Sequence, residues 1–162
     1  MPQHYFEENY LSSQSRPVRL RIARVRPSAR RTASRLLQLE KGLRRALDRS
    51  ELSLAYQPIV SLADGRLNGF ETLVRWQHPE FGAIEPSAFI PVAEESGLIL
   101  PLGEWVLHEA CRQMRRWQEA FPAHAALCIS VNVSAKQLQD KRFSDRVRGA
   151  LAQSGLCASI CG

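Results

Sequence analysis

The chain has 162 residues, of which 44% are hydrophobic and 23% charged, a composition ordinary for one globular domain with its own core. No stretch approaches the roughly 18 consecutive apolar residues of a membrane span, and the N-terminus lacks the apolar segment of a secretory signal. The net charge of +6 is uneven, because residues 1–50 hold 12 Lys and Arg against 4 Asp and Glu. We therefore expect a cytoplasmic protein without a membrane span, with its excess positive charge in the first third.

Residues 1–33 are predicted to form a basic leader ahead of the domain, which we place at residues 34–162. The leader shows no helical period and ends in an arginine-rich run: Arg16, Arg19, Arg21, Arg24, Arg26, Arg30 and Arg31. Such a run could bind nucleic acid through its phosphates, but no aromatic side chain interleaves the arginines to stack bases. Pro17 and Pro27 also argue against regular structure. We therefore interpret the leader as a disordered tail and do not expect nucleic-acid binding.

A helix is predicted to open the domain at Ser34, a suitable N-cap, and to run to about Arg49. Its apolar residues recur every three or four positions, as on one buried face of a helix: Leu36, Leu39, Leu43 and Leu47. We expect this face to pack on the rest of the domain.

A β-hairpin is predicted to follow this helix. Apolar and polar residues alternate in residues 52–57, and the turn at residues 63–66 leads directly into a second strand at residues 69–76. Two strands joined by so short a link are antiparallel neighbours, because a parallel pair needs a crossover of a dozen residues or more. Gln57 is therefore expected on the strand beside Glu71.

Two charged side chains, Glu71 and Arg75, interrupt the second strand of this hairpin. Because strand side chains alternate between faces, Glu71, Leu73 and Arg75 share one surface, opposite that of Trp76. Four residues place Glu71 and Arg75 roughly 13 Å apart, too far for a mutual salt bridge but suited to one extended ligand. The carboxylate could hold a hard cation and the guanidinium a phosphate. The alternative is an edge strand whose charges merely face water.

Three further helices and one strand are predicted in the second half of the chain. Residues 86–95 form a short helix that starts at a proline, and residues 144–153 form the last one. Between them, the helix from Pro101 carries a buried stripe of Leu107, Ala110, Met114, Trp117 and Phe121. Residues 127–134 alternate strictly, so Asn132 lies on a small polar face near the end of a central strand, where α/β barrels carry their chemistry.

The four cysteines do not indicate a metal site. Cys111, Cys128, Cys157 and Cys161 lack the CxxC or Cys/His spacing of a zinc centre. Two of them lie in apolar periodic segments, where a free cysteine behaves as a small hydrophobe. We therefore predict neither a structural zinc nor a disulfide.

The order of these elements resembles the EAL domain, the bacterial family of cyclic-di-GMP phosphodiesterases. Five collinear motifs carry the resemblance, at family-like spacing: residues 39–47, 54–60, 71–76, 89–94 and 130–138. The signature tripeptide reads Glu71-Thr72-Leu73 instead of Glu-Ala-Leu. Since Thr72 faces away from Glu71 in a strand, we expect this difference to have little effect.

The resemblance implies an α/β fold, namely a partial TIM-type (β/α) barrel whose first strand runs antiparallel to the others and whose C-terminal half is missing. It implies that the intact family hydrolyses cyclic-di-GMP to linear pGpG with two Mg²⁺ or Mn²⁺ ions. Carried over by position, Glu71 and Asn132 would be metal ligands and Arg75 a phosphate contact. Gln57 and Leu73 would belong to the substrate-binding surface.

The later motifs of the family, which complete the metal shell and activate water, have no counterpart in this sequence. A barrel of this type needs about 250 residues. We therefore predict the front half of a cyclic-di-GMP phosphodiesterase that is inactive as this chain alone. The alternative is a non-catalytic module that binds cyclic-di-GMP or a protein. The open edge of half a barrel also invites pairing with a second copy or with a partner chain.

Overall fold

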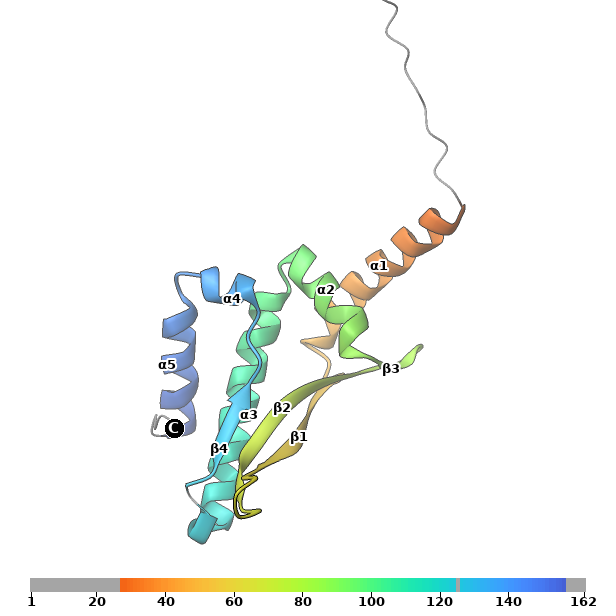
Figure 1. Ribbon diagram of the computed structural model, residues 1–162. Helices are drawn as coiled ribbons and strands as arrows, with labels where there is room; N and C mark the ends of the chain where they lie inside the picture. Colours follow the sequence, from red (N-terminus) through yellow and green to blue (C-terminus); the bar gives the residue numbers. More distant parts are fainter. Residues whose placement is uncertain (1–26, 125, 157–162) are drawn as a thin grey trace, which may run out of the picture.

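The computed structural model of the protein describes residues 27–124 and 126–156. The long helix α3 runs along one face of a four-stranded sheet (Figure 1). In chain order the elements are α1 (Pro27–Ala46), β1 (Leu52–Val60), β2 (Leu67–His78), β3 (Gly82–Ile84), α2 (Pro86–Ser96), α3 (Ile99–Ala120), a 3₁₀ turn (Pro122–His124), β4 (Cys128–Val131), α4 (Ala135–Gln139) and α5 (Phe143–Ser154). None of the helices in the described residues is long and apolar enough to cross a membrane.

Strand β2 lies at the centre of the sheet. β1 pairs antiparallel along one edge of β2, with Gln57 opposite Glu71, which confirms the predicted hairpin. On the other edge, β4 pairs in parallel with residues 69–72, and β3 pairs antiparallel with residues 76–78. Residues 73–75 of β2 therefore have no strand partner on this edge within the described chain. The predicted α/β fold with an antiparallel first strand is confirmed, and the described strands form an open sheet instead of a closed barrel.

The face of β2 that carries Trp76, opposite Glu71 and Arg75, packs on the core of the domain. Thr72 and Trp76 are buried on this face. The Trp76 ring packs edge-on against Phe89 of α2, with ring centroids 5.4 Å apart. Further along the strand, Phe70 contacts Trp117 of α3 at a centroid distance of 4.7 Å. Helices α2 and α3 thus cover the same face of the sheet, and the opposite face carries Glu71.

Helix α1 begins earlier than predicted, at Pro27 and not at Ser34, and ends at Ala46. A proline suits the first turn of a helix, because its missing N–H would have no intrahelical partner there. The predicted inward face is correct for Leu39 and Leu43, whereas Leu36 is 42% exposed because the helix extends past the core at that point. Residues 27–33 of the predicted leader are therefore helical and not disordered, whereas residues 1–26 lie outside the described residues, so the predicted disorder is untested there.

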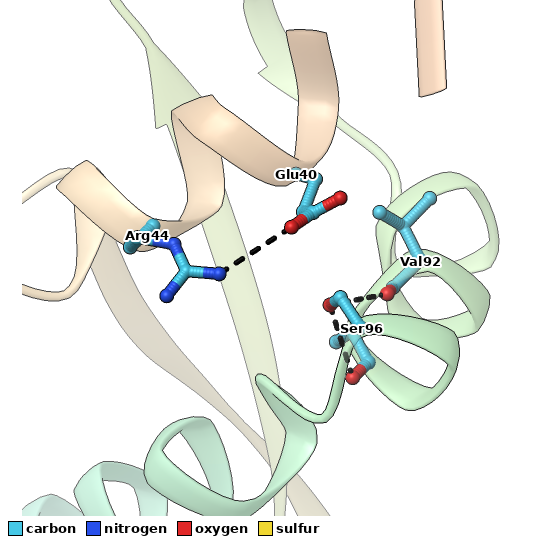
Figure 2. Close-up of polar contacts among 5 residues, drawn as sticks. Glu40, Arg44, Val92 and Ser96 are labelled. Atoms are coloured by element: carbon cyan, nitrogen blue, oxygen red, sulfur yellow. Dashed lines mark hydrogen bonds and ion pairs between the residues drawn. The ribbon is translucent and has the colours of Figure 1, made fainter. Parts of the chain in front are cut away.

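Local hydrogen bonds stabilise the neighbouring helices α1 and α2 (Figure 2). In α1, Arg44 Nη2 donates to Glu40 Oε1 at 3.3 Å, and such an exposed pair one turn apart contributes about 0.3–0.5 kcal/mol. In the last turn of α2, Ser96 Oγ donates to the Val92 carbonyl oxygen at 2.7 Å. Gly97 then ends the helix with a φ of 78°, as predicted from its place in the sequence.

Helices α3 and α5 form a second, smaller core. Leu107 and Cys111 of α3 pack with Ala150 of α5, and Val147 and Leu151 of α5 lie against them. The predicted stripe of α3 is correct except at its end. Phe121 is 58% exposed, because it follows the last helical turn as the C-cap residue and so no longer shares the buried face.

Of the two cysteines that the structure describes, one is a free thiol and the other forms a disulfide. Cys111 is free and buried, and burial raises the pKa of its thiol, so this side chain stays protonated at neutral pH. Cys128 is disulfide-bonded, so the prediction that no cysteine forms a disulfide is wrong at this position. Sequence spacing does not reveal which cysteines meet in space, and that proximity decides whether a bridge can form. Cys157 and Cys161 lie outside the described residues.

The structure contains three short elements that the sequence pattern did not predict, namely β3, the 3₁₀ turn and α4. Strand β4 also ends at Val131, before the predicted end at Ser134. The reason is local, because Ser134 is the N-cap of α4 and takes an extended conformation with its side chain bonded to the helix. Asn132 consequently lies just beyond the end of the strand.

Candidate functional site

Two side chains from distant parts of the sequence meet at one end of the sheet. Glu71 lies in β2 opposite Ser130 of β4, and Asn132 follows directly after β4. Asn132 Nδ2 donates a hydrogen bond to Glu71 Oε1 at 2.8 Å. Because β2 and β4 are parallel neighbours and Val131 at the end of β4 pairs with Thr72, Asn132 leaves β4 beside the middle of β2, next to Glu71. The structure therefore brings together the two residues that the resemblance implied as metal ligands.

The other predicted site residues lie on the same face of the sheet as Glu71. Gln57 is exposed directly across from Glu71 in β1, and Leu73 is half-buried in β2. Arg75 is exposed, and its Nη1 donates to the carbonyl oxygen of Val74 at 3.0 Å. Within the described part of the chain Arg75 forms no ion pair. Its guanidinium can therefore turn to an anionic ligand without breaking a salt bridge.

Tyr56 follows the alternation of β1 and points away from this surface. Its ring packs edge-on against Trp117 of α3 at a centroid distance of 4.8 Å. Burial, and then the negative charge of Glu109, raise the pKa of the Tyr56 phenol. The phenol is therefore neutral near pH 7 and lies on the side of the sheet opposite Gln57, so it takes no part in the acid–base chemistry of the site.

A cavity of about 280 Å³ opens beside Arg75 and Asn132. It lies where residues 73–75 of β2 have no strand partner, and apolar side chains of α2 and α3 form its inner wall: Ile90, Ile99, Leu102 and Val106. Thr72 also lines the cavity, and its Oγ1 is buried without a hydrogen-bond partner. A buried hydroxyl without a partner costs about 1–3 kcal/mol. The threonine of the Glu-Thr-Leu tripeptide is thus a source of instability.

Replacing Thr72 with valine is expected to raise the free energy of unfolding by about 1 kcal/mol, because a methyl group replaces the unpaired hydroxyl at similar volume. Thermal unfolding followed by circular dichroism should show a Tm higher by about 2–4 °C for a chain of this size. Thr72→Ala is the matched comparison and should gain less, because it also enlarges the cavity. A lower Tm for Thr72→Val would show that the hydroxyl is hydrogen-bonded in solution.

The donor atoms of the site suit one hard cation. Glu71 offers a carboxylate and Asn132 carries an amide oxygen, the ligand types that Mg²⁺ and Mn²⁺ take from proteins. In the structure the amide nitrogen of Asn132 faces Glu71, so a cation shared by the two side chains requires the amide to turn its oxygen toward the carboxylate. Mg²⁺ commonly binds through one or two protein oxygens together with waters and substrate phosphates. Among the described residues no group of three or more His, Cys, Asp or Glu side chains is placed to hold a metal. The residues described therefore fit a single cation and fall short of a two-metal centre.

Close backbone approaches shape the site, and the sequence pattern gave no sign of them. A Cβ built at Gly69 would overlap the carbonyl oxygen of Cys128 and lie 2.8 Å from its carbonyl carbon. A Cβ built at Gly103 would overlap the side-chain amide of Gln137. In both cases the glycine and its neighbour belong to segments that meet only in the folded chain. For Gln137 a local signal did exist, because Ser134-x-x-Gln137 is the pattern of a capping box.

Comparison with known proteins agrees with this geometry. The EAL domain model matches residues 40–161. The bifunctional diguanylate cyclase/cyclic di-GMP phosphodiesterase MucR of Pseudomonas aeruginosa is 48% identical over 124 residues, which are 76% of this chain and 18% of MucR. The cyclic di-GMP phosphodiesterase NbdA of the same organism is 45% identical over 126 residues, 78% of this chain and 16% of NbdA. A structure of the MucR phosphodiesterase in complex with c-di-GMP matches with a TM-score of 0.70 and 49% identity, over 74% of this chain and 47% of that one.

The open α/β sheet, with β2 and β4 paired in parallel and helices over one face, matches the class of TIM-barrel-like domains. Within that class, the chain belongs to the EAL domain family. It spans less than half of the MucR phosphodiesterase structure and under a fifth of the MucR and NbdA sequences. The residues that match the EAL domain model include all five predicted site residues.

Proposed function

We propose that the chain provides the N-terminal half of a cyclic-di-GMP phosphodiesterase site and that, alone, it binds the nucleotide without hydrolysing it. One observation carries the proposal, namely the 2.8 Å hydrogen bond between Asn132 and Glu71 on the face that also presents Gln57 and Arg75. Membership of the EAL family supports the choice of ligand, since a related solved structure is described as a complex with c-di-GMP.

Each residue of this surface has a role that its chemistry allows. The planar guanidinium of Arg75 binds a phosphate through two parallel hydrogen bonds. Gln57 and Leu73 lie on the same face and contact the nucleotide between its phosphates. Glu71 and Asn132 hold one Mg²⁺ or Mn²⁺ ion, which when bound would supply positive charge to the phosphate.

The same residues account for the proposed lack of turnover. Hydrolysis with two metal ions clamps both the attacking and the leaving oxygen and needs ligands for both ions. Glu71 and Asn132 contribute two protein oxygens. We place neither a second cation nor a general base among the described residues of this face. Binding without cleavage is the activity that this set of side chains supports.

Isothermal titration calorimetry with cyclic-di-GMP, with and without Mg²⁺, tests the proposal, together with chromatography for linear pGpG. Arg75→Ala is expected to weaken nucleotide binding roughly tenfold to a hundredfold, because charge-assisted hydrogen bonds are worth about 1.5–3 kcal/mol. Arg66→Ala is the control, since Arg66 is exposed and pairs with Asp64 in the turn before β2. Absence of nucleotide binding would refute the proposal, and pGpG formation lost in Glu71→Ala would refute its non-catalytic part.

A second candidate function is a protein-interaction module. In the described chain β4 pairs with β2 alone, so its outer edge has no partner strand there and could add a further one. Light scattering after size exclusion would reveal a second copy at this edge. A stable dimer that binds no cyclic-di-GMP would favour this function over the first.

A further inference from the structure

The short helix α4 begins directly after the segment that carries Asn132. Only Val133 separates Asn132 from Ser134, the N-cap of α4. Ser134 and Gln137 form a reciprocal capping box, in which Ser134 Oγ accepts from the Gln137 N–H at 3.3 Å and Gln137 Oε1 accepts from the Ser134 N–H at 3.1 Å. The backbone two residues after Asn132 is therefore fixed by the Gln137 side chain.

Gln137 is itself fixed by the body of the domain. Its side chain is only 5% exposed, although glutamine is usually a surface residue. It lies against Gly103 of α3 so closely that a Cβ at residue 103 would overlap its Nε2 and approach its Cδ to 2.7 Å. The glycine thus leaves a recess in α3 that the amide of Gln137 fills.

Two further contacts hold the ends of α4. Lys136 donates from Nζ to the carbonyl oxygen of Glu94, near the end of α2. At the other end, Arg146 of α5 pairs with Glu104 of α3 and lies 3.2 Å from Asp140, the C-cap residue of α4. Helix α4 is consequently docked on α2, α3 and α5 at once, and Gln137 is its buried point of attachment.

We propose that Gln137 is a positioning residue for Asn132, acting through the capping box and the recess at Gly103. The inference deepens the proposed function, because it concerns how the Asn132 amide is held for the cation shared with Glu71. Asn132 is exposed, and among the described residues the side chain that it hydrogen-bonds is Glu71, so little else in this part of the chain restrains it. Loss of the Gln137 contact frees the chain between β4 and α4 and lets the amide leave the carboxylate.

The test compares Gln137→Ala, Gln137→Glu and the control Gln139→Ala, which removes an exposed side chain from the same helix. Mn²⁺ affinity is measured by electron paramagnetic resonance, and metal-free cyclic-di-GMP affinity by calorimetry. Gln137→Ala should weaken Mn²⁺ binding roughly tenfold, as substitution of other residues that orient a metal ligand does. The affinity for cyclic-di-GMP in the absence of metal should stay unchanged. Gln137→Glu should restore Mn²⁺ binding, because a glutamate at this position also accepts from the N-cap N–H.

A second readout does not depend on any ligand. In ¹H–¹⁵N spectra the Asn132 side-chain amide should show one hydrogen-bonded proton in the wild type, in Gln137→Glu and in Gln139→Ala, and lose it in Gln137→Ala. If Gln137→Ala does not fold, Ser134→Ala removes the other half of the box and should produce the same loss. A wild type that binds no Mn²⁺ or nucleotide refutes the proposed function, while the Asn132 signal still decides the inference. An unchanged Asn132 signal in both variants overturns it.

Discussion

Replacing Glu71 with alanine is expected to weaken Mg²⁺-dependent binding of cyclic-di-GMP at least tenfold. Among the described residues Glu71 is the carboxylate at the proposed cation position, and it also accepts the hydrogen bond from Asn132. Without it the cation loses its charged protein ligand, and the remaining amide oxygen of Asn132 binds Mg²⁺ too weakly to hold it. Calorimetric titration of the nucleotide at fixed Mg²⁺ concentrations measures the loss.

Two further variants serve as comparisons for Glu71→Ala. Glu71→Gln keeps the size of the side chain and an oxygen that can accept from Asn132, and removes only the charge. It should lose the Mg²⁺ dependence as Glu71→Ala does. Glu95→Gln removes a charge from an exposed position of α2 and should bind like the wild type. Full Mg²⁺-dependent affinity in Glu71→Gln would contradict the assignment of Glu71 as a metal ligand.

Replacing Gly69 with alanine is expected to lower the free energy of unfolding by about 3 kcal/mol, the upper range for a side chain forced into a packed interior. The added methyl group would overlap the Cys128 carbonyl oxygen and lie 2.8 Å from its carbonyl carbon. These are backbone atoms, so no change of rotamer relieves the clash, and β4 must move away from β2. Denaturation followed by circular dichroism should show a Tm lower by about 6–12 °C.

Gly149 offers a matched control for this substitution. It lies inside α5, and a methyl group added there would meet nothing within 4 Å beyond the backbone of its own helix, so Gly149→Ala adds helix propensity without a clash. It should be neutral or stabilise the protein by up to about 1 kcal/mol. Gly69→Ala should also remove the hydrogen bond between Glu71 and Asn132, since it displaces the strand before Asn132. Equal stability of the two variants would show that β4 is not held at the distance seen in the structure.

The faces of β2 could be predicted from the sequence because strict alternation leaves little freedom. Once Trp76 and Thr72 are inward, Glu71 and Arg75 must share the outer face, and the structure shows both sets as expected. The short hairpin likewise determined that Gln57 would lie beside Glu71. The alternation of side chains along a strand and the length of a turn are local properties of the sequence. The two faces of β2 and the pairing of Gln57 with Glu71 could therefore be predicted without knowledge of the fold.

Features that depend on tertiary contacts were missed. The end of α1 beyond the core exposes Leu36, and the end of α3 exposes Phe121, although both fit the helical period. The disulfide of Cys128 and the recess at Gly103 arise from segments that approach each other only after folding. Strand alternation indicated Asn132 as a polar residue near a strand end and the family resemblance gave it a ligand role, but its contact with Glu71 could not be derived from the pattern of β4.

The two halves of the candidate site differ in the length of chain that must close to form them. Gln57 reaches Glu71 across one turn, whereas Asn132 lies 61 residues from Glu71 in sequence, with α2 and α3 between them. Loop-closure entropy grows by about 0.6 kcal/mol for each doubling of the loop, so the Asn132 contact costs about 1 kcal/mol more to close. The hairpin carries Gln57, Glu71, Leu73 and Arg75 as one local unit. Asn132 joins them only when the long segment between Glu71 and Asn132 is folded.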